Sequence, residues 1–272
     1  MFSSIKLNYT LVQKKGQNYS GLVVACHLQA KVKDQPKTYD WMAKVPLDDP
    51  TKFNWLRITQ REEKELGFYQ DVIPALKDFI TQKGSAIQLS FCPFVYGEFN
   101  KDIPKEKVVQ SSMIIMEHLS PLGFMEPVNK KSGLDLDHAK LAIKSLGEFH
   151  AASHAFYNAK YGDLENILEK DHIQTNDFIP EIIAHFNDKQ TNRIYQTLTY
   201  VGVNGHKYVE SYKQFAKDVV NPLKLRDQLS NPKVCEFNVL CHGDPWFNNM
   251  LFKYDGQKPI VVCLLDSSPT ID

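Results

Sequence analysis

The hydrophobic pattern of the chain changes its period near residue 120. Before that point, short segments alternate between apolar and polar residues, which is typical of half-buried β-strands. After it, apolar residues recur every three or four positions, which indicates amphipathic helices. No Pro-rich or low-complexity linker separates the two parts. We therefore expect a β-rich lobe over residues 1–119 and a helical lobe over residues 120–272, with a ligand cleft between them.

The first part of the chain predicts a small α+β lobe of five strands and one helix. The helix is expected between the third and fourth strands, over residues 59–77, with a late interruption at Pro74. In the third strand, Lys44 lies on the face opposite the aromatic and apolar residues. The expected strands cover residues 6–13, 22–31, 39–45, 85–96 and 111–118.

The second part is expected to be mainly helical. Apolar residues at helical spacing between Ala139 and Ser153 predict one helix, for which Asp135 is a suitable N-cap. Two more helical stretches cover residues 177–200 and 206–229. The chain then returns to short apolar segments, first at residues 239–241 and later in two short strands that end at Asp266. The polar loop His242–Asn249 lies between them.

Composition excludes several classes of protein. With 43% hydrophobic and 24% charged residues, a chain of 272 residues can bury a sizeable core and is not a disordered tail. Lys and Arg number 32, as do Asp and Glu, which disfavours a sequence-independent nucleic-acid binder. No apolar run is long enough to span a membrane, and no secretory signal is visible. Five cysteines without a Cys-x-x-Cys pair favour reduced thiols, so we expect a cytoplasmic protein.

The polar loop carries the most informative spacing in the chain. Asp244 is followed five residues later by Asn249, and Asp266 ends the apolar run at residues 260–265. Phosphoryl transfer from a nucleotide needs a carboxylate to accept the hydroxyl proton and hard oxygen ligands to hold magnesium on the phosphates. The kinase catalytic loop has the same Asp-to-Asn spacing. An Asp or Asn in a polar loop is more often a simple turn residue. The hypothesis of a phosphoryl-transfer site therefore depends on finding all of these residues together.

A kinase also needs a fixed cation to hold the phosphates, and Lys44 is the candidate. A lone lysine on a strand is more often solvated. However, Glu62 and Glu65 each share a stripe of the expected helix with apolar residues, and a buried carboxylate needs a cationic partner. Lys44 precedes that helix, as in the strand-lysine to helix-glutamate pair of kinases. The spacing favours Glu65 and keeps Glu62 as the second choice.

Several short stretches distributed over nearly the whole chain match the motifs of one family. Together they resemble the ecdysteroid kinase-like proteins, also called choline-kinase-like (CHK) domain proteins, within the aminoglycoside phosphotransferase and choline kinase group. The last of them, around Asp244, is the most specific match. The stretches are Gly16-Gln17-Asn18-Tyr19-Ser20, Ala43-Lys44-Val45-Pro46, Glu65-Leu66-Gly67-Phe68-Tyr69, Met116-Glu117-His118-Leu119-Ser120, Leu146-Gly147-Glu148-Phe149-His150-Ala151-Ala152-Ser153 and His242-Gly243-Asp244-Pro245-Trp246-Phe247-Asn248-Asn249.

The resemblance implies a bilobal protein-kinase-like fold and an ATP- and magnesium-dependent (Mg2+) small-molecule kinase. It implies that Asp244 is the catalytic base and that Asn249 and Asp266 are the magnesium ligands. It selects Glu65 over Glu62 as the residue that orients Lys44 toward the phosphates. The family's substrates are small hydroxyl-bearing molecules such as ecdysone-type steroids, and foreign compounds are also proposed. The implied nucleotide-binding positions are Gly16, Asn18, Tyr19 and Ser20 in the loop, and Glu117 and Leu119 in the hinge.

Two departures from the family pattern produce an alternative hypothesis. Ser267 and Ser268 follow Asp266, where the family usually has an aromatic residue and Gln. The family also continues with helices that complete the substrate pocket, so we expect a truncated, incomplete C-terminal lobe. The alternative is therefore a truncated, catalytically inactive kinase-like protein that binds a ligand.

Overall fold

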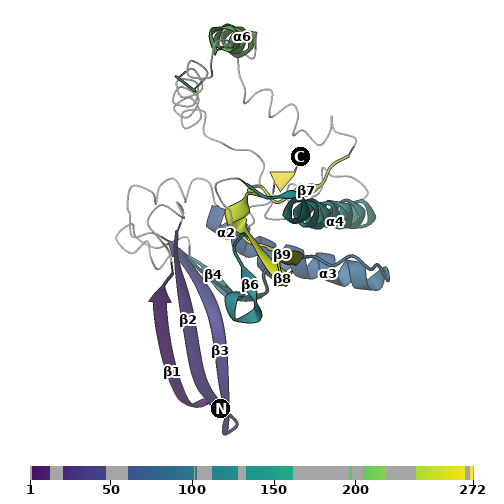
Figure 1. Ribbon diagram of the computed structural model, residues 1–272. Coiled ribbons are helices and arrows are strands. Elements are labelled where there is room, and N and C mark those ends of the chain that lie inside the picture. Colours follow the sequence, from purple (N-terminus) through teal and green to yellow (C-terminus); the bar gives the residue numbers. More distant parts are fainter. Residues whose placement is uncertain are drawn as a thin grey trace.

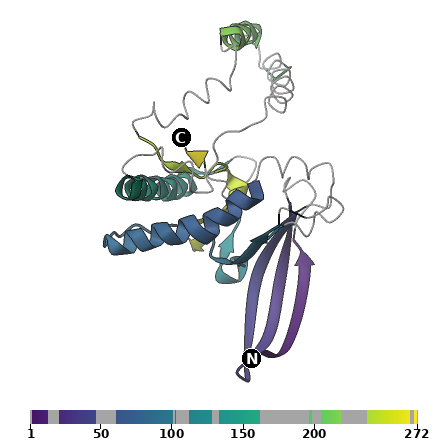
Figure 2. The ribbon, with the colours of Figure 1, turned by 180° about the vertical axis from the view of Figure 1, so that it is seen from behind.

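A computed structural model describes residues 2–12, 21–46, 61–100, 102, 112–127, 133–161, 196–197, 205–218, 237–266 and 270–271. These residues form a mixed α/β structure with a β-rich N-terminal sheet, consistent with a kinase-like fold (Figure 1). Strands β1–β3 extend away from the helices α3 and α4 in both opposite views (Figures 1 and 2). Among the described helices, none is long and apolar enough to cross a membrane.

The N-terminal sheet contains five strands, the predicted number, in the order β1-β2-β3-β5-β4, and all neighbours are antiparallel. The long hairpins arise because period-two alternation lets each strand present one apolar face. The strands are β1 (Phe2–Leu11), β2 (Gly21–Val32), β3 (Gln35–Pro46), β4 (Phe94–Phe99) and β5 (Ser112–Glu117).

The prediction for the fourth strand was wrong in its position, because β4 begins only at Phe94. Residues 85–90 are irregular, and the segment that follows them bonds to a distant part of the chain. Leu264 donates its N–H to the carbonyl of Ser90 (2.7 Å), and Cys92 donates its N–H to the carbonyl of Leu264 (3.1 Å). Phe91 and Leu264 thereby form an isolated parallel bridge. The carbonyl of Ser90 and the N–H of Cys92 are thus satisfied outside the N-terminal sheet.

The predicted helix continues through Pro74 to residue 82, which corrects the expected interruption. It consists of α2 (Arg61–Gly67), the π-helical turn η1 (Phe68–Val72) and α3 (Ile73–Gln82). Pro74 lies in the first turn of α3, where a missing N–H is tolerated. In the π-turn, Ile73 donates its N–H to Phe68, five residues back.

The helix expected after residue 135 is α4 (Leu136–Tyr161), and Asp135 caps it as predicted. One carboxylate oxygen of Asp135 accepts the backbone N–H groups of Asp137 (3.1 Å) and His138 (3.0 Å). The imidazole of His138 also contacts this oxygen and the Tyr254 hydroxyl, both within 2.8 Å. The helix expected over residues 206–229 is described as α6 (Gly205–Asp218), and residues 219–229 lie outside the described residues. The stretch predicted at 177–200 lies outside the described residues, apart from 196–197.

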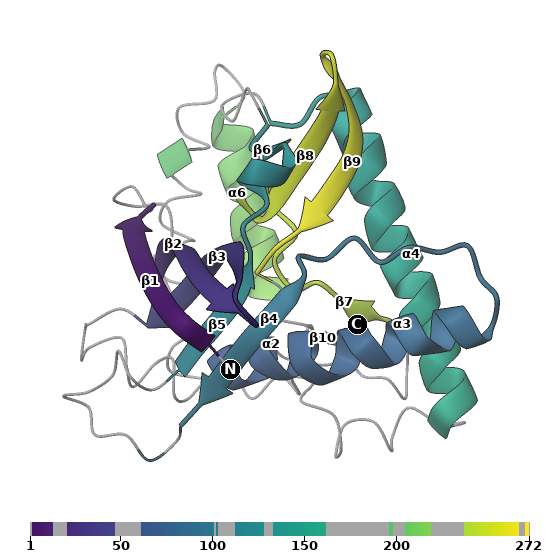
Figure 3. The ribbon, with the colours of Figure 1, turned by 90° about the horizontal axis from the view of Figure 1, so that it is seen from below.

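Two small sheets complete the described fold. The strands β6 (Phe124–Met125), β8 (Met250–Asp255) and β9 (Lys258–Leu264) form one sheet, and Figure 3 shows β8 and β9 beside α4. Strands β8 and β9 are the two short strands predicted before Asp266. The second sheet pairs β7 (Leu240–Cys241) with β10 (Thr270–Ile271). Single 3₁₀ turns, η3 (Ser120–Leu122) and η5 (Phe247–Asn249), precede β6 and β8.

The centre of the core is a cluster of three phenylalanines from separate parts of the chain. Phe68 of η1, Phe91 and Phe149 of α4 contact one another edge to face, with ring centroids 5.0–5.8 Å apart. Strands on the far side of residue 120 add further apolar side chains to the same core. Fully buried examples are Leu240, Phe252 and Leu264. The core therefore joins the β-rich and helical parts beneath the polar loop.

Candidate functional site

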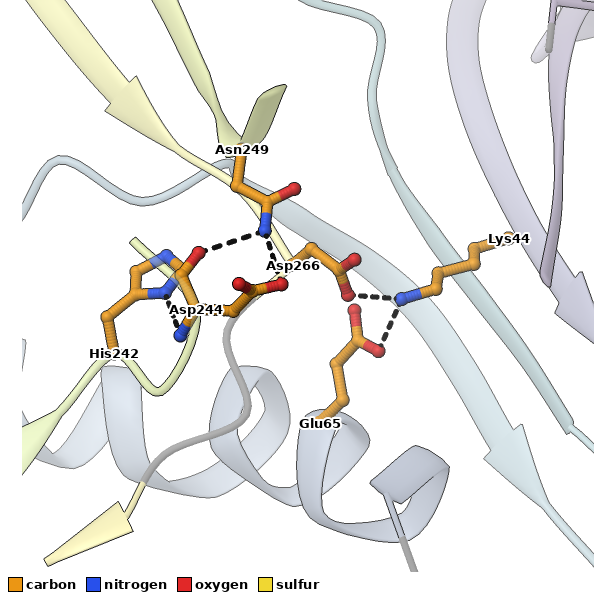
Figure 4. Close-up of polar contacts among 6 residues, drawn as sticks. All are labelled: Lys44, Glu65, His242, Asp244, Asn249 and Asp266. Atoms are coloured by element: carbon orange, nitrogen blue, oxygen red, sulfur yellow. Dashed lines mark hydrogen bonds and ion pairs between the residues drawn. The ribbon is translucent and has the colours of Figure 1, made fainter. Parts of the chain in front are cut away.

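Lys44 lies at the centre of an ion-pair cluster built from three distant elements (Figure 4). Its ammonium group, projecting from β3, donates to the carboxylate of Glu65 on α2 (2.7 Å) and to that of Asp266, which follows β9. Lys44 is 13% exposed and Glu65 1% exposed, so the interpretation as a solvated strand lysine is wrong. Glu62, the second choice from the sequence, is partly buried, and burial raises the pKa of its carboxyl.

The cluster places one ammonium group next to two carboxylates. Burial disfavours the charged form of the ammonium group and of the carboxylates alike. Burial opposes the charge on Lys44, but the carboxylates of Glu65 and Asp266 outweigh it and raise the pKa of the ammonium above its usual value. Burial raises the pKa of Glu65 to about 7, against the attraction of Lys44. In the described part of the chain, the Oε1 atom of Glu65 has no hydrogen-bond partner. Lys44 therefore stays charged at neutral pH.

The backbone places Asp266 at the cluster through an uncommon conformation. Its φ angle is +52°, in the left-handed region that Asp tolerates better than most residues. One residue earlier, Leu265 donates its N–H to the carbonyl of Asn249 (2.9 Å). The chain thus turns sharply just after it is tied to the polar loop, and the carboxylate of Asp266 meets Lys44. Ser267 and Ser268 lie outside the described residues.

The loop His242–Asn249 folds onto itself around Asp244. Gly243 has φ +84°, which favours glycine, and Trp246 donates its N–H to the carbonyl of Asp244 (2.9 Å). The side-chain amide of Asn249 donates to the same carbonyl (3.0 Å) and to the carboxylate of Asp244 (3.2 Å). The Asp-x-x-x-x-Asn spacing thus brings the two side chains into contact, with Asn249 buried (Figure 4).

His242 belongs to the same constellation, although the sequence analysis gave it no role. It is 1% exposed, and its Nδ1 accepts the N–H of Asp244 (3.4 Å). Burial lowers the pKa of His242, against the nearby charges of Asp266 and Asp244, which favours the neutral imidazole. Its ring stacks on Phe91 with centroids 6.1 Å apart. The sequence signal was its position two residues before Asp244.

The remaining predicted positions are not brought into the ion-pair cluster. The carbonyl of Glu117 accepts the Cys92 thiol (3.5 Å), and its N–H is bonded to the carbonyl of Pro93 (2.9 Å). Leu119 is buried, and its carbonyl accepts two backbone N–H groups of the following turn. The predicted nucleotide loop lies outside the described residues, which applies to Gly16, Asn18, Tyr19 and Ser20.

The oxygen atoms near Asp244 fit one kind of metal ion better than others. Within the described ranges, no group of three His, Cys, Asp or Glu side chains could hold a metal. Mg2+ does not require such a cage, because it keeps several waters and usually takes one or two protein ligands plus phosphate oxygens. Asn249 and Asp266 carry hard oxygen donors, and their segments are joined by a backbone hydrogen bond. This donor set fits Mg2+ bound together with a nucleotide.

The family to which this chain belongs follows from a match to a protein-family model. The model of the ecdysteroid kinase-like family matches residues 15–270. The chain belongs to the ecdysteroid kinase-like family. As a member of this family, it is related to kinase-like small-molecule phosphotransferases, a class that generally uses ATP. The match includes Lys44, Glu65, Asp244 and Asp266. No curated protein matches the chain.

Proposed function

We propose that this ecdysteroid kinase-like protein transfers the γ-phosphate of ATP to a hydroxyl group of a small lipophilic molecule such as an ecdysteroid. The observation that carries the proposal is the convergence of Lys44, Glu65 and Asp266 beside the Asp244–Asn249 pair. A phosphoryl-transfer enzyme needs these groups together: a cation, its orienting carboxylate, a proton acceptor and hard oxygen ligands. On a solvated surface, these side chains would have no partners to hold them close to one another.

In this proposal, Lys44 binds the phosphates of the nucleotide. Its raised pKa keeps the ammonium charged, and Glu65 holds it from the buried side at 2.7 Å. Glu65 has the role of orienting Lys44 rather than of contacting substrate, since it is almost fully buried. The two carboxylates around Lys44 fix its direction before the nucleotide arrives, which reduces the ordering required on binding.

Asp244 acts as the base in the proposed reaction. The substrate hydroxyl gives its proton to the carboxylate of Asp244, while its oxygen forms a bond to the γ-phosphorus. The bond between that phosphorus and the bridging oxygen breaks, and ADP leaves with the electron pair. The side-chain amide of Asn249 holds the Asp244 carboxylate in one orientation. Neutral His242 supports the backbone of the same loop.

Asn249 and Asp266 would hold Mg2+ through their side-chain oxygens. When bound, the ion would neutralise charge on the phosphates of the nucleotide. The hinge positions Glu117 and Leu119 would contact the nucleotide base, and the loop residues Gly16, Asn18, Tyr19 and Ser20 its phosphates. This division assigns residues 1–119 to nucleotide binding and residues 120–272 to catalysis. Cys26, Cys92 and Cys263 are free thiols, which supports a cytoplasmic location.

The test compares the parent protein with Asp244→Asn in an assay of phosphate transfer from ATP, using a panel of ecdysteroids and other small alcohols. Loss of the proton acceptor should lower the rate by about 10²–10⁴-fold. ATP affinity, measured by calorimetry with and without Mg2+, should change little, because Asn249 and Asp266 are intact. Asp255→Asn, at the exposed last residue of β8, is the matched control and should keep the parent rate.

Three results would contradict the proposal. Equal rates for the parent and Asp244→Asn would remove the base from this position. Equal ATP affinities with and without Mg2+ would remove the metal role of Asn249 and Asp266. Tight ATP binding without transfer to any alcohol on the panel would favour a nucleotide-binding protein without kinase activity.

A further inference from the structure

Helix α4 carries two buried serines whose hydroxyl groups have different surroundings. Ser153 is fully buried, donates its hydroxyl hydrogen to the carbonyl of His150 (3.0 Å) and accepts the N–H of Leu240 (3.1 Å). Ser145 is 5% exposed, and its hydroxyl has no hydrogen-bond partner within the described residues. The hydroxyl of Ser153 therefore connects α4 to β7, whereas the hydroxyl of Ser145 makes no such connection to another described element.

His154, the next residue of α4, makes a second connection to the same strand region. Its Nδ1 donates to the carbonyl of Asn238 (3.0 Å), and its Nε2 accepts from the side-chain amide of Asn158 (2.9 Å). Because a carbonyl can only accept, this arrangement requires the hydrogen on Nδ1. The His154 ring also packs on Phe237, with centroids 4.3 Å apart. Two adjacent side chains thus hold two backbone groups just before the polar loop.

These contacts matter because β7 leads directly into the loop that contains Asp244. Leu240 is fully buried and begins β7, and Asp244 follows four residues later. A buried N–H group needs a partner, and the hydroxyl of Ser153 supplies one to Leu240. A displacement of about 1 Å at a reacting group can lower a rate by about 100-fold. The position of this strand is therefore coupled to the position of the proposed base.

We propose that Ser153 and His154 are positioning residues that set the location of Asp244 through β7, an inference that rests on the proposed function. They touch neither substrate nor nucleotide in this proposal. Their contribution is to the turnover step, because the Lys44 cluster is held by other elements. Loss of the Ser153 hydroxyl leaves the apolar packing of α4 unchanged in shape but removes the partner of the Leu240 N–H.

The experiment compares Ser153→Ala with Ser145→Ala, since both remove one buried hydroxyl from the same helix. For Ser153→Ala we expect kcat to fall by about 10–100-fold, with the KM for ATP within about twofold of the parent. Ser145→Ala should retain the parent kcat. Hydrogen exchange at the Leu240 amide should become at least about tenfold faster in Ser153→Ala and stay at the parent rate in Ser145→Ala.

His154→Ala provides an independent variant at a partly exposed position, should Ser153→Ala fold poorly. It should lower kcat in the same direction and speed exchange in the segment from Phe237 to Leu240. Equal kcat values for parent, Ser153→Ala and His154→Ala would overturn the proposal. Equal losses in Ser153→Ala and Ser145→Ala would also overturn it, because a general packing defect would then explain both.

The exchange measurement separates this inference from the proposed function. If the parent protein phosphorylates no alcohol, the proposed function fails. The exchange rates still test whether the Ser153 hydroxyl holds the Leu240 amide. Faster Leu240 exchange in Ser153→Ala alone would support the anchoring role of the hydroxyl. Unchanged Leu240 exchange in that variant would overturn it, whatever the activity.

Discussion

At the scale of single residues, the site depends on a charge imbalance around Lys44. One ammonium faces the carboxylates of Glu65 and Asp266, and all three side chains are less than one-fifth exposed. Removing one partner of a buried ion pair leaves uncompensated charge, which is more costly than the absence of the whole pair. The structure therefore predicts a strong and pH-dependent effect of replacing Lys44.

Lys44→Met should lower the free energy of unfolding by about 3 kcal/mol at neutral pH, because the buried carboxylate of Glu65 and the partly buried carboxylate of Asp266 lose their cation. Without that cation, the pKa of Glu65 should rise above its present value of about 7. A carboxyl whose folded pKa is raised binds its proton more tightly when folded, so its stabilising contribution is lost as pH rises through that pKa. Urea unfolding should thus show a larger loss at pH 8 than at pH 5.

Lys37→Met is the matched control for this measurement, because Lys37 lies on the same strand and is exposed. Its effect should stay within about 0.5 kcal/mol at both pH values. A loss for Lys44→Met that is the same at pH 5 and pH 8 would contradict the proposed charge imbalance.

At the scale of elements, the β2–β3 hairpin closes through a demanding turn. Val32 pairs with Gln35, so only Lys33 and Asp34 form the loop. Their φ angles are +49° and +62°, the pattern of a type I′ turn. This turn matches the twist of the strands, but glycine is the residue that reaches it without steric strain. The hairpin that carries Lys44 thus contains a local weakness in its turn.

Asp34→Gly should raise the free energy of unfolding by about 0.5–1 kcal/mol, because glycine adopts a positive φ angle readily. Thermal or urea unfolding measures the change. Thr38→Gly, at an exposed position within β3, should have the opposite effect, since glycine weakens a strand interior. Destabilisation by both substitutions would show that the turn is not strained at Asp34.

The pattern of apolar and polar residues predicted those elements that are determined by residues close together in the sequence. Alternation identified four of the five strands of the N-terminal sheet, and the apolar stripe beside Glu65 identified its helix and its need for a cation. The cap of α4 was equally local, because Asp135 bonds residues two and three positions ahead. Such signals are complete within a short window of sequence.

Features that depend on distant partners could not be predicted in this way. Residues 85–90 carry apolar positions suited to a strand, but the adjoining backbone bonds to Leu264. Pro74 indicated an interruption, whereas the helix continues through it directly after the π-turn. The contact of Ser153 with Leu240 joins residues 87 positions apart and has no local signature.

At the scale of the whole molecule, one core supports both the sheet side and the helical side of the chain. Phe91 contacts Phe68 and Phe149 edge to face and stacks on His242 of the polar loop. The packing of the core therefore also determines where the loop lies. Damage to this cluster should affect the protein as one unit.

Phe91→Ala should lower the free energy of unfolding by about 3–5 kcal/mol, because it removes a buried ring and leaves a cavity. A single unfolding transition should remain in calorimetry, since the core is shared. Val95→Ala, at a position 40% exposed, should cost less than about 1 kcal/mol. Two separate transitions in Phe91→Ala would mean that the sheet side unfolds independently.

The pairing of Ser90 with Leu264 also has a consequence for the order in which the protein is made. The ribosome produces Leu264 only after roughly 170 further residues have followed Ser90, which at typical elongation rates of 5–20 residues per second takes about 10–30 s. During that interval, the segment around Phe91 has been synthesised but its partner strand does not yet exist. The segment around Phe91 must therefore leave the ribosome with apolar surface uncovered, and we expect slower synthesis or scarce chaperones to reduce the yield of folded protein.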